Sequence, residues 1–565
     1  MKPKALLVMN VLLVGSLLLS ACGATATPTV EPTKPPAAAA QTVAAATPAP
    51  VTAVPPTGAA PTASPSKERK TTANTDQRYP KIRIGIAADP QDLSPWNVNM
   101  GSKPYIYQNF YEYLFDFVDN DYVPVLAKSY KVIDDLHYQV QIYDYIYDHA
   151  GNHITADDVV NCVKYYVDHG YAVKYDIFKD IKKVDDYTVE YTWSKPVTRV
   201  GELEHPWCRT PIYSRKAFES GNFATNPVGT GPYVVKQFVS GSKVILEAND
   251  KYWQKDKSLV NPRHQAHVQT IEYDVIPEPS QHVIALKTGT IDVSELVPFD
   301  SLAEFQDGGP LASKYDVLRT YGSQLWGMVC NTSPGNPGND INFRLAVWYA
   351  IDNEAVAKAT RTCAPAKAFG TPFFADYVKA WESKPSYINT YDPRLAKEYL
   401  AKSRYDGRSL KFVANGGEPS KTMATVIQAF LANVGIKAEI TLVEGQVAGS
   451  LWPKPEAWDI MLYSLGGGSQ IGEWNRVMNN KELGTGMSHG FIKDDKLQQL
   501  FEAASAVATH DEAHMTALHD YVLEKAYLYA VAVPTINLVY SSNIAKVVLR
   551  ENEFFLPGAC TYYLE

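Results

Sequence analysis

Apolar and polar residues alternate along several stretches of this chain. Residues 81–86 read Lys-Ile-Arg-Ile-Gly-Ile and place isoleucine at every second position, which is typical of a β-strand with one buried face. Residues 138–147 and 188–193 predict two further strands. A helix is predicted to begin after Thr155, because Thr155 can cap its first turn and Asp158 stands at the capping-box position. Strands and helices are interspersed along the chain, so the sequence predicts an α/β fold.

The first apolar run has a different character. Residues 5–19 follow Lys2 and Lys4 and precede Ala21 and Cys22. A basic start, a short apolar run and small residues at a cleavage point are typical of an export signal. This run of 15 residues is also shorter than the ~20 that span a bilayer. The cysteine directly after the small residues resembles a bacterial lipobox, which implies that residues 1–21 are removed and that Cys22 is lipidated. The alternative is an ordinary signal peptide that contains Cys22.

A low-complexity stretch follows the cysteine. Residues 24–66 consist mainly of Ala, Pro and Thr, and Glu31 and Lys34 are their only charged residues. Such a segment cannot bury enough apolar surface to offset its chain entropy. We therefore expect residues 22–78 to form a disordered tether between the lipid anchor and the folded part of the chain.

The overall composition is that of a globular protein with several domains. The chain has 565 residues, of which 45% are hydrophobic and 20% are charged, and this length predicts two or three domains. The net charge of −8 argues against nucleic acid as a partner. After residue 19 the sequence has no apolar run of the length that spans a membrane.

The cysteines give no sign of a metal or redox site. If Cys22 is lipidated, five cysteines are left in an exported chain, so at most two disulfides can form and at least one thiol stays free. Their pairing cannot be read from the sequence. Their spacings are wide and include no C-x-x-C motif, so neither a metal nor another cofactor is expected. The five are Cys162, Cys208, Cys330, Cys363 and Cys560.

Four segments together resemble one protein family. They are 126–130 with 151–159, 229–233 with 243–253, 285–293, and Asn331 with 340–352. The second is the most specific, since it reads Gly-Thr-Gly-Pro-Tyr and is followed by a strand and Tyr-Trp. In this order the segments resemble the family 5 extracellular solute-binding proteins of bacterial ABC importers, the dipeptide- and oligopeptide-binding group. The resemblance covers about residues 79–565.

The resemblance implies a two-lobed, type II periplasmic-binding-protein fold with an extra inserted domain, the arrangement known as cluster C. Ligand is expected in a cleft between the lobes. Lobe one is expected to comprise residues 79–118, 227–320 and 537–565, the inserted domain residues 119–226, and lobe two residues 321–536.

The same resemblance implies a function without catalysis. We expect a monomeric lipoprotein at the outer face of the cell membrane that binds a small solute and delivers it to the transmembrane subunits of an ABC permease. The alternative is a solute sensor or surface receptor that uses the same fold without transport.

The family also suggests where ligand is bound. Peptide binders of this family hold the ligand ammonium with an aspartate in lobe two, and the matching positions here are glycines followed by Ser469, with Glu473 as the nearest acid. The missing acid and the many aromatic residues fit an uncharged ligand such as an oligosaccharide, and an oligopeptide is an equal alternative. Each candidate has core or hinge packing, or a flexible turn, as its alternative role. The candidates are Trp96, Asn97, Gln324, Trp326, Gly466, Gly467, Gly468 and Trp474.

Two other patterns resemble enzyme motifs only superficially. Residues 240–243 fit S-x-x-K and residues 287–289 fit K-T-G, but the serine falls in a predicted hairpin turn and not at the start of a helix. His510 and His514 are four residues apart, as in some metal sites, yet the residues around them are charged and typical of a solvated helix face. We therefore expect no enzymatic activity.

Overall fold

The computed structural model describes residues 77–97, 104–118, 121–171, 175, 177–466, 469–479, 481, 492–550 and 554–564. The predicted signal peptide, Cys22, almost all of the predicted tether, Gly467 and Gly468 lie outside these ranges. Within the described ranges, no helix combines the length and the apolar character needed to cross a membrane.

The sheet of lobe one is built around the first predicted strand. This strand, β1 (Tyr79–Ile86), pairs in parallel with β10 (Val268–Val275) and with the short β11 (Val293–Ser294). Antiparallel β9 (Lys243–Ala248) and β8 (Tyr233–Val239) extend the sheet beyond β10. The isoleucines of β1 are buried, which confirms the strand predicted from their alternation. Residues 240–242 form the turn between β8 and β9, so Ser240 lies in a hairpin turn, as expected.

The inserted domain has an antiparallel sheet of its own. Its strand order is β4 (Ala127–Asp134), β5 (His137–Ile142), β7 (Thr188–Trp193) and β6 (Phe178–Asp185). Helix α2 (Ala156–Asp168) packs on β6 and β7. The strand expected over residues 138–147 ends at Ile142, because its partners β4 and β7 both begin opposite that end. The remaining strand expectation, 188–193, is confirmed as β7.

The predicted start of α2 is confirmed in detail. The backbone N–H of Thr155 donates to the Asp158 carboxylate at 2.8 Å, and the capping box is closed in both directions. An aspartate therefore performs the role that glutamate usually has at this position.

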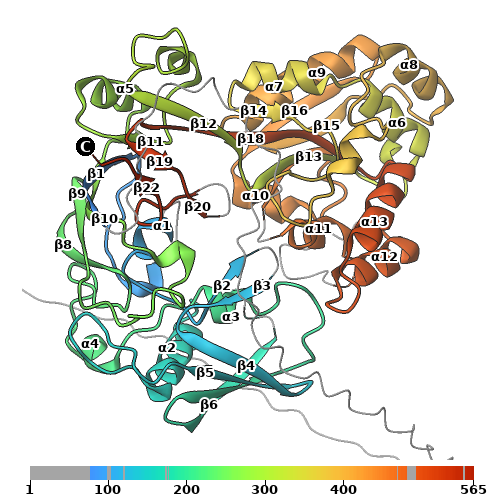
Figure 1. Ribbon diagram of the computed structural model, residues 1–565. Helices are drawn as coiled ribbons and strands as arrows, with labels where there is room; N and C mark the ends of the chain where they lie inside the picture. Colours follow the sequence, from blue (N-terminus) through green and yellow to red (C-terminus); the bar gives the residue numbers. More distant parts are fainter. Residues whose placement is uncertain are drawn as a thin grey trace, which may run out of the picture. The chain divides into compact units, whose positions relative to one another are not determined.

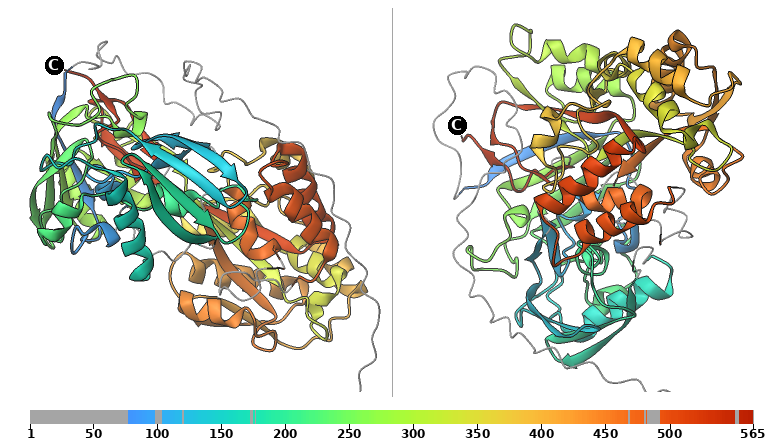
Figure 2. Two further views of the ribbon diagram at one scale, coloured as in Figure 1. Left: turned by 90° about the horizontal axis from the view of Figure 1, so that it is seen from below. Right: turned by 90° about the vertical axis from the view of Figure 1, so that its right-hand side faces the viewer.

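Lobe two has a mixed sheet covered by helices. Strand β17 (Ile460–Gly466) lies between antiparallel β13 (Gln324–Cys330) and parallel β15 (Leu410–Asn415), and β16 (Ala438–Val443) forms the edge. Figure 2 shows the last two helices of the chain, α12 and α13, packed side by side. The principal helices are α6 (Ile341–Tyr349), α7 (Asn353–Thr360), α8 (Pro393–Lys402), α9 (Ser420–Val434), α11 (Gln470–Met478), α12 (Asp495–Ser505) and α13 (Glu512–Glu524).

One long strand joins the two sheets. The first half of β18 (Leu528–Ser541) pairs with β13 and with β14 (Cys363–Pro365), and its second half pairs with β12 (Tyr315–Tyr321) and β11 (Figure 1). The pairing partners of β18 change at Pro534, whose carbonyl accepts a hydrogen bond of 2.8 Å from the N–H of Gly322. Lobe one and lobe two are thus connected through β18 and through the short link from β12 to β13.

The hydrophobic cores follow this division. One cluster fills lobe two and includes the first residues of β18, whereas a second cluster runs without interruption from the β1 sheet into the inserted domain. The inserted domain therefore shares its core with lobe one. The five described cysteines are buried, and the structure has no disulfide among them. Burial raises the pKa of the thiol of Cys560 to about 12.

Shorter strands and helices make up the rest of the secondary structure in the described residues. The strands among them are β2 (Phe115–Val118), β3 (Asp121–Pro124), β19 (Ile544–Lys546), β20 (Leu549–Arg550), β21 (Phe554–Phe555) and β22 (Thr561–Tyr562). The helices are α1 (Pro104–Tyr107), α3 (Glu204–Cys208), α4 (Arg215–Glu219), α5 (Pro279–Thr288) and α10 (Gly445–Leu451), with short 3-10 turns at η1 (Pro95–Asn97), η2 (Pro262–His264), η3 (Phe299–Glu304), η4 (Pro337–Asn339) and η5 (Lys379–Ser383).

Candidate functional site

The start of β13 brings several predicted ligand residues together beside the link between the lobes. Gln324 pairs with Gly466 and Trp326 pairs with Ser464 across β13 and β17. Directly opposite residues of an antiparallel pair share one face of the sheet, so these four residues lie on the same face. Gln324 and Ser464 are exposed, Gly466 is half-buried, and Trp326 is 8% exposed. We call these four residues the hinge face.

Ser464 was not among the residues predicted from the sequence. It stands two residues before Gly466, and the alternation of side chains along a strand was the signal that could have found it. The opposite face of the same strands is closed, because a Cβ on Gly327 would approach the Tyr463 ring to 2.8 Å. Trp452 packs on Tyr463 with ring centroids 5.1 Å apart. Of the two faces of β13 and β17, the hinge face is the one that presents polar side chains to solvent.

The helix that follows β17 is held by buried acids. The Asp376 carboxylate accepts bonds from the backbone N–H groups of Gln470 (2.8 Å) and Ile471 (3.0 Å) at the start of α11. The Gln470 side chain accepts from Thr371 N at 2.9 Å and donates to Glu473 at 3.1 Å. Both acids are therefore used inside lobe two, beneath the end of β17.

Glu473, the nearest acid to the glycine run, lies in the interior. It is 0% exposed, and burial raises the pKa of its carboxyl well above the ordinary value. A carboxyl group that is buried and whose pKa is raised favours its neutral form and does not offer a negative charge to a ligand at the surface. Glu473 is therefore not placed to act as the ammonium-binding aspartate that the family resemblance implies for peptide binders.

Two of the predicted tryptophans lie in packed surroundings. Trp474 is fully buried and stacks on Trp381 at 5.4 Å, and Trp381 in turn stacks on His519 at 4.4 Å. Trp96 is half-buried in η1, where aromatic rings of the inserted domain surround it at 5.5–6.4 Å. These placements fit the packing alternative for both residues. The side chain of Asn97 lies outside the described set.

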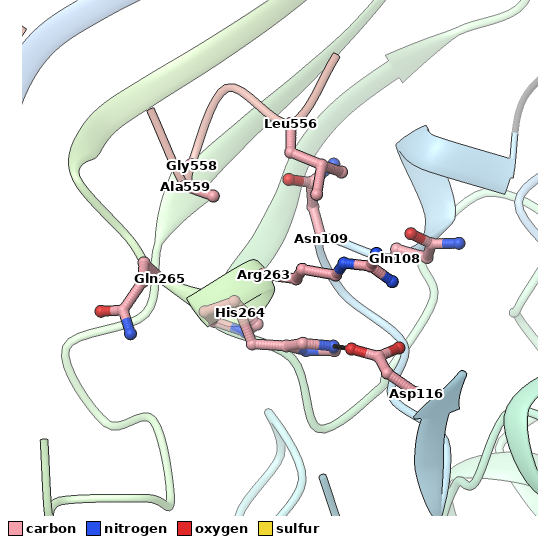
Figure 3. Close-up of a pocket in the computed structure, with 10 residues that line it drawn as sticks. Gln108, Asn109, Asp116, Arg263, His264, Gln265, Leu556, Gly558 and Ala559 are labelled. Atoms are coloured by element: carbon pink, nitrogen blue, oxygen red, sulfur yellow. Dashed lines mark ion pairs between the residues drawn. The ribbon is translucent and has the colours of Figure 1, made fainter. Parts of the chain in front are cut away.

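A small polar cavity lies in lobe one, beside the C-terminal segment (Figure 3). Its volume is about 10 Å³, which suits a single water molecule and not a peptide or a sugar. His264 lies at its wall, with its ring nitrogens 3.2 Å from Glu112 and 3.2 Å from Asp116. Burial opposes the charge on His264, but the two carboxylates outweigh it and raise the pKa of His264 to about 9. The folded lobe therefore favours the protonated form of His264.

The two histidines that resembled a metal motif do not meet. His510 bonds to the carbonyl of Ala504 at 2.8 Å, and His514 pairs with Asp511 at 2.8 Å on the surface of α13. No group of potential metal ligands occurs among the residues that the structure describes.

With the fold in place, comparison with known proteins identifies the class. The sequence model described as "Bacterial extracellular solute-binding proteins, family 5 Middle" matches residues 121–486. The chain belongs to this family of bacterial extracellular solute-binding proteins.

The chain aligns with known relatives over most of their length. The chain is 25% identical to the glutathione-binding protein GsiB of Pectobacterium atrosepticum over 404 residues, covering 69% of this chain and 75% of the relative. It is 24% identical to heme-binding protein A of Haemophilus influenzae over 504 residues, covering 79% and 87%. It is 23% identical to the oligopeptide-binding protein AppA of Bacillus subtilis over 417 residues, covering 68% and 72%.

Solved structures confirm the fold. HbpA2 from Haemophilus parasuis superposes with a TM-score of 0.72 at 19% identity, covering 86% of this chain and 100% of the other. AppA from Bacillus subtilis, solved in complex with a nonapeptide, superposes with a TM-score of 0.63 at 18% identity and the same coverage. The two-lobed α/β fold predicted from the sequence is thereby confirmed.

Proposed function

We propose that this chain is the substrate-binding lipoprotein of an ABC importer. Cys22 anchors it to the outer face of the cell membrane, and the tether lets the folded part move while it stays near the permease. The lobes capture an oligopeptide or an oligosaccharide, and the closed form delivers it to the permease subunits. The protein acts as a monomer and performs no catalysis.

The hinge face is the observation that carries this proposal. It combines the exposed polar side chains of Gln324 and Ser464 with the edge of Trp326, on rigid strands beside the connection between the lobes. Movement of the lobes about β18 and the β12–β13 link can close this face over a solute. A ligand that contacts both lobes favours the closed state over the open one.

The chemistry of this face suits an uncharged group of the ligand. An amide and a hydroxyl can hydrogen-bond either a peptide backbone or the hydroxyls of a sugar, and an indole supports either by apolar contact. The acids below the face, Asp376 and Glu473, are occupied within lobe two. Relatives of this chain include glutathione-binding and oligopeptide-binding proteins, which is a reason to include a peptide library in the test.

Thermal-shift screening tests the ligand class. A ligand present at 100 times its dissociation constant adds ~2.7 kcal/mol to the free energy of unfolding, so a binder is detected as a higher melting temperature. The screen should cover peptides and oligosaccharides in parallel. If no compound of either library raised the melting temperature, the proposed ligand classes would be wrong.

Substitution of Gln324 tests the location. Gln324→Ala should weaken binding of the identified ligand about fivefold to tenfold, because one hydrogen bond is removed, and should leave the melting temperature without ligand unchanged. Gln237, an exposed glutamine on β8 of lobe one, is the matched control, and Gln237→Ala should leave affinity unchanged. Equal effects of the two substitutions would remove the hinge face from the binding site.

A further inference from the structure

A short antiparallel contact joins the inserted domain to lobe two. Residues 198–200 of the inserted domain run beside residues 505–507, at the C-terminal end of α12. Val507 N donates to Thr198 O at 2.8 Å, and Val200 N donates to Ser505 O at 3.1 Å. Between these two bonds, Arg199 and Ala506 face each other as an isolated β-bridge.

Side chains reinforce the backbone contact. The Arg199 guanidinium donates to the side-chain oxygen of Asn475 in α11 at 3.1 Å, and Asn479 donates to the same oxygen at 2.8 Å. The Val200 side chain packs against both hydrophobic cores, that of lobe two and that shared by lobe one and the inserted domain. The contact therefore combines polar and apolar interactions on a small area.

The inserted-domain side of the contact is ordered by one carboxylate. Glu202 accepts bonds from Thr198 N at 2.8 Å and from Arg199 N and Nε at 3.0 Å each. Gly201 has a φ of +80°, a left-handed conformation that glycine adopts without strain. The loop is thus held in shape by its own bonds, and little further ordering is needed when it meets lobe two.

The lobe-two side is ordered in the same way. The α12 helix ends at Ser505, and the next residue, Ala506, has an extended backbone with φ of −71° and ψ of 134°. The side chain of Thr509 bonds to the Ala503 carbonyl at 2.6 Å and that of His510 to the Ala504 carbonyl at 2.8 Å. Each side of the contact therefore has hydrogen bonds of its own that favour its shape.

We propose that residues 198–200 and 505–507 form a latch that holds the inserted domain against lobe two when the lobes are closed and that separates when they open. This inference rests on the proposed function, since it concerns the closure of the same binding protein. Because the inserted domain shares its core with lobe one, the latch links the two sides whose separation would expose the hinge face. It includes none of the hinge-face residues, so it shifts the balance of open and closed states without touching the ligand.

Proline substitution tests the latch with little disturbance elsewhere. Val507→Pro removes the N–H that bonds to Thr198, and the extended backbone of Ala506 accepts a following proline. Hydrogen exchange of the full chain without ligand should show roughly tenfold faster exchange of the peptide 198–202, which contains the Val200 N–H. The matched control is Glu512→Pro at the first position of α13, where proline is tolerated and Asp511 before it is extended. The control should leave that peptide unchanged.

A second substitution keeps the test decisive if the proline variant does not fold. Asn475→Ala removes the acceptor of Arg199 and should speed exchange of the peptide 198–202 about threefold to tenfold. Equal exchange of this peptide in the native chain, Asn475→Ala and any folded Val507→Pro would overturn the latch. Exchange is measured without ligand, so this test does not require a known solute. If the peptide 198–202 is protected in the native chain but the chain binds no solute, only the proposed function is overturned. Once a ligand is known, weaker binding by Asn475→Ala further supports the latch, and unchanged binding counts against it.

Discussion

Lobe one and lobe two both bury carboxyl groups, but the groups that surround these carboxyls differ between the lobes. In lobe one, Glu112 and Asp116 flank His264 at 3.2 Å each. Glu112 also accepts bonds from Tyr252 at 2.6 Å and Trp253 at 2.8 Å. In lobe two, Glu473 accepts one bond of 3.1 Å from Gln470, and burial raises its pKa well above the ordinary value.

The difference teaches that burial alone does not decide whether a group is charged. All of these side chains are inaccessible or nearly so. Two carboxylates stabilise the imidazolium of His264 and raise its pKa to about 9. Burial favours the neutral form of Glu473, because the bond from Gln470 and the nearby Arg476 do not offset desolvation and Asp376 raises its pKa further. Lobe one therefore contains a buried ion cluster, whereas the buried acid of lobe two favours its neutral form.

Removal of the central cation should have the largest effect. His264→Ala leaves two buried carboxylates without their shared partner, so we expect the free energy of unfolding to fall by ~3–5 kcal/mol. Urea denaturation measures the change. His514, a half-exposed histidine paired with Asp511 on α13, provides the control, and His514→Ala should stay within ~0.5 kcal/mol of the native chain. A loss below ~1 kcal/mol for His264→Ala would show that the lobe-one cluster is not ionised.

The pH dependence of stability should separate the two lobes. His264 has a pKa raised from 6.5 to about 9 in the folded protein. Its stabilising contribution is therefore complete below pH ~6.5, declines as the pH rises to ~9 and is lost above it. Glu473 also has a raised pKa, from an ordinary value of 4.5, so its destabilising effect begins as the pH rises above ~4.5.

Denaturation curves at several pH values can assign each window to its lobe. The difference in unfolding free energy between the native chain and His264→Gln should shrink between pH 6.5 and about 9. The difference between the native chain and Glu473→Gln should instead change from pH ~4.5 upward. If both differences changed over the same window, the contrast between the lobes would be wrong.

Local sequence signals predicted local structure well. The alternation of isoleucines located β1, and the spacing of Thr155 and Asp158 located the start of α2, because neighbours in sequence decide both features. The strand expected over residues 138–147 was too long because its end depends on where β4 and β7 begin. Strand ends of this kind are set by partners that are distant in sequence.

The candidate site was predictable only in part for the same reason. Gln324, Trp326 and Gly466 were identified through the family resemblance, and pairing of β13 with β17 brings them together. The burial of Trp474 and Glu473 depends on Trp381, Gln470 and Asp376, and no local pattern shows these contacts. The latch joins Arg199 to Ala506, residues whose separation in sequence gives no sign of their contact.

The smallest expected effect is the sharpest test of the comparison. Glu473→Gln replaces a neutral acid by a neutral amide of the same shape, and the amide oxygen can still accept the bond from Gln470. We expect a change within ~1 kcal/mol at neutral pH, because no charge is removed from the interior. Asp116→Asn, the matched substitution in lobe one, removes a charge that faces His264 and should destabilise by ~2–4 kcal/mol. Urea denaturation of both variants at pH 7 measures the difference. A larger loss of unfolding free energy for Glu473→Gln than for Asp116→Asn would mean that Glu473 is ionised and that lobe two stabilises a buried charge.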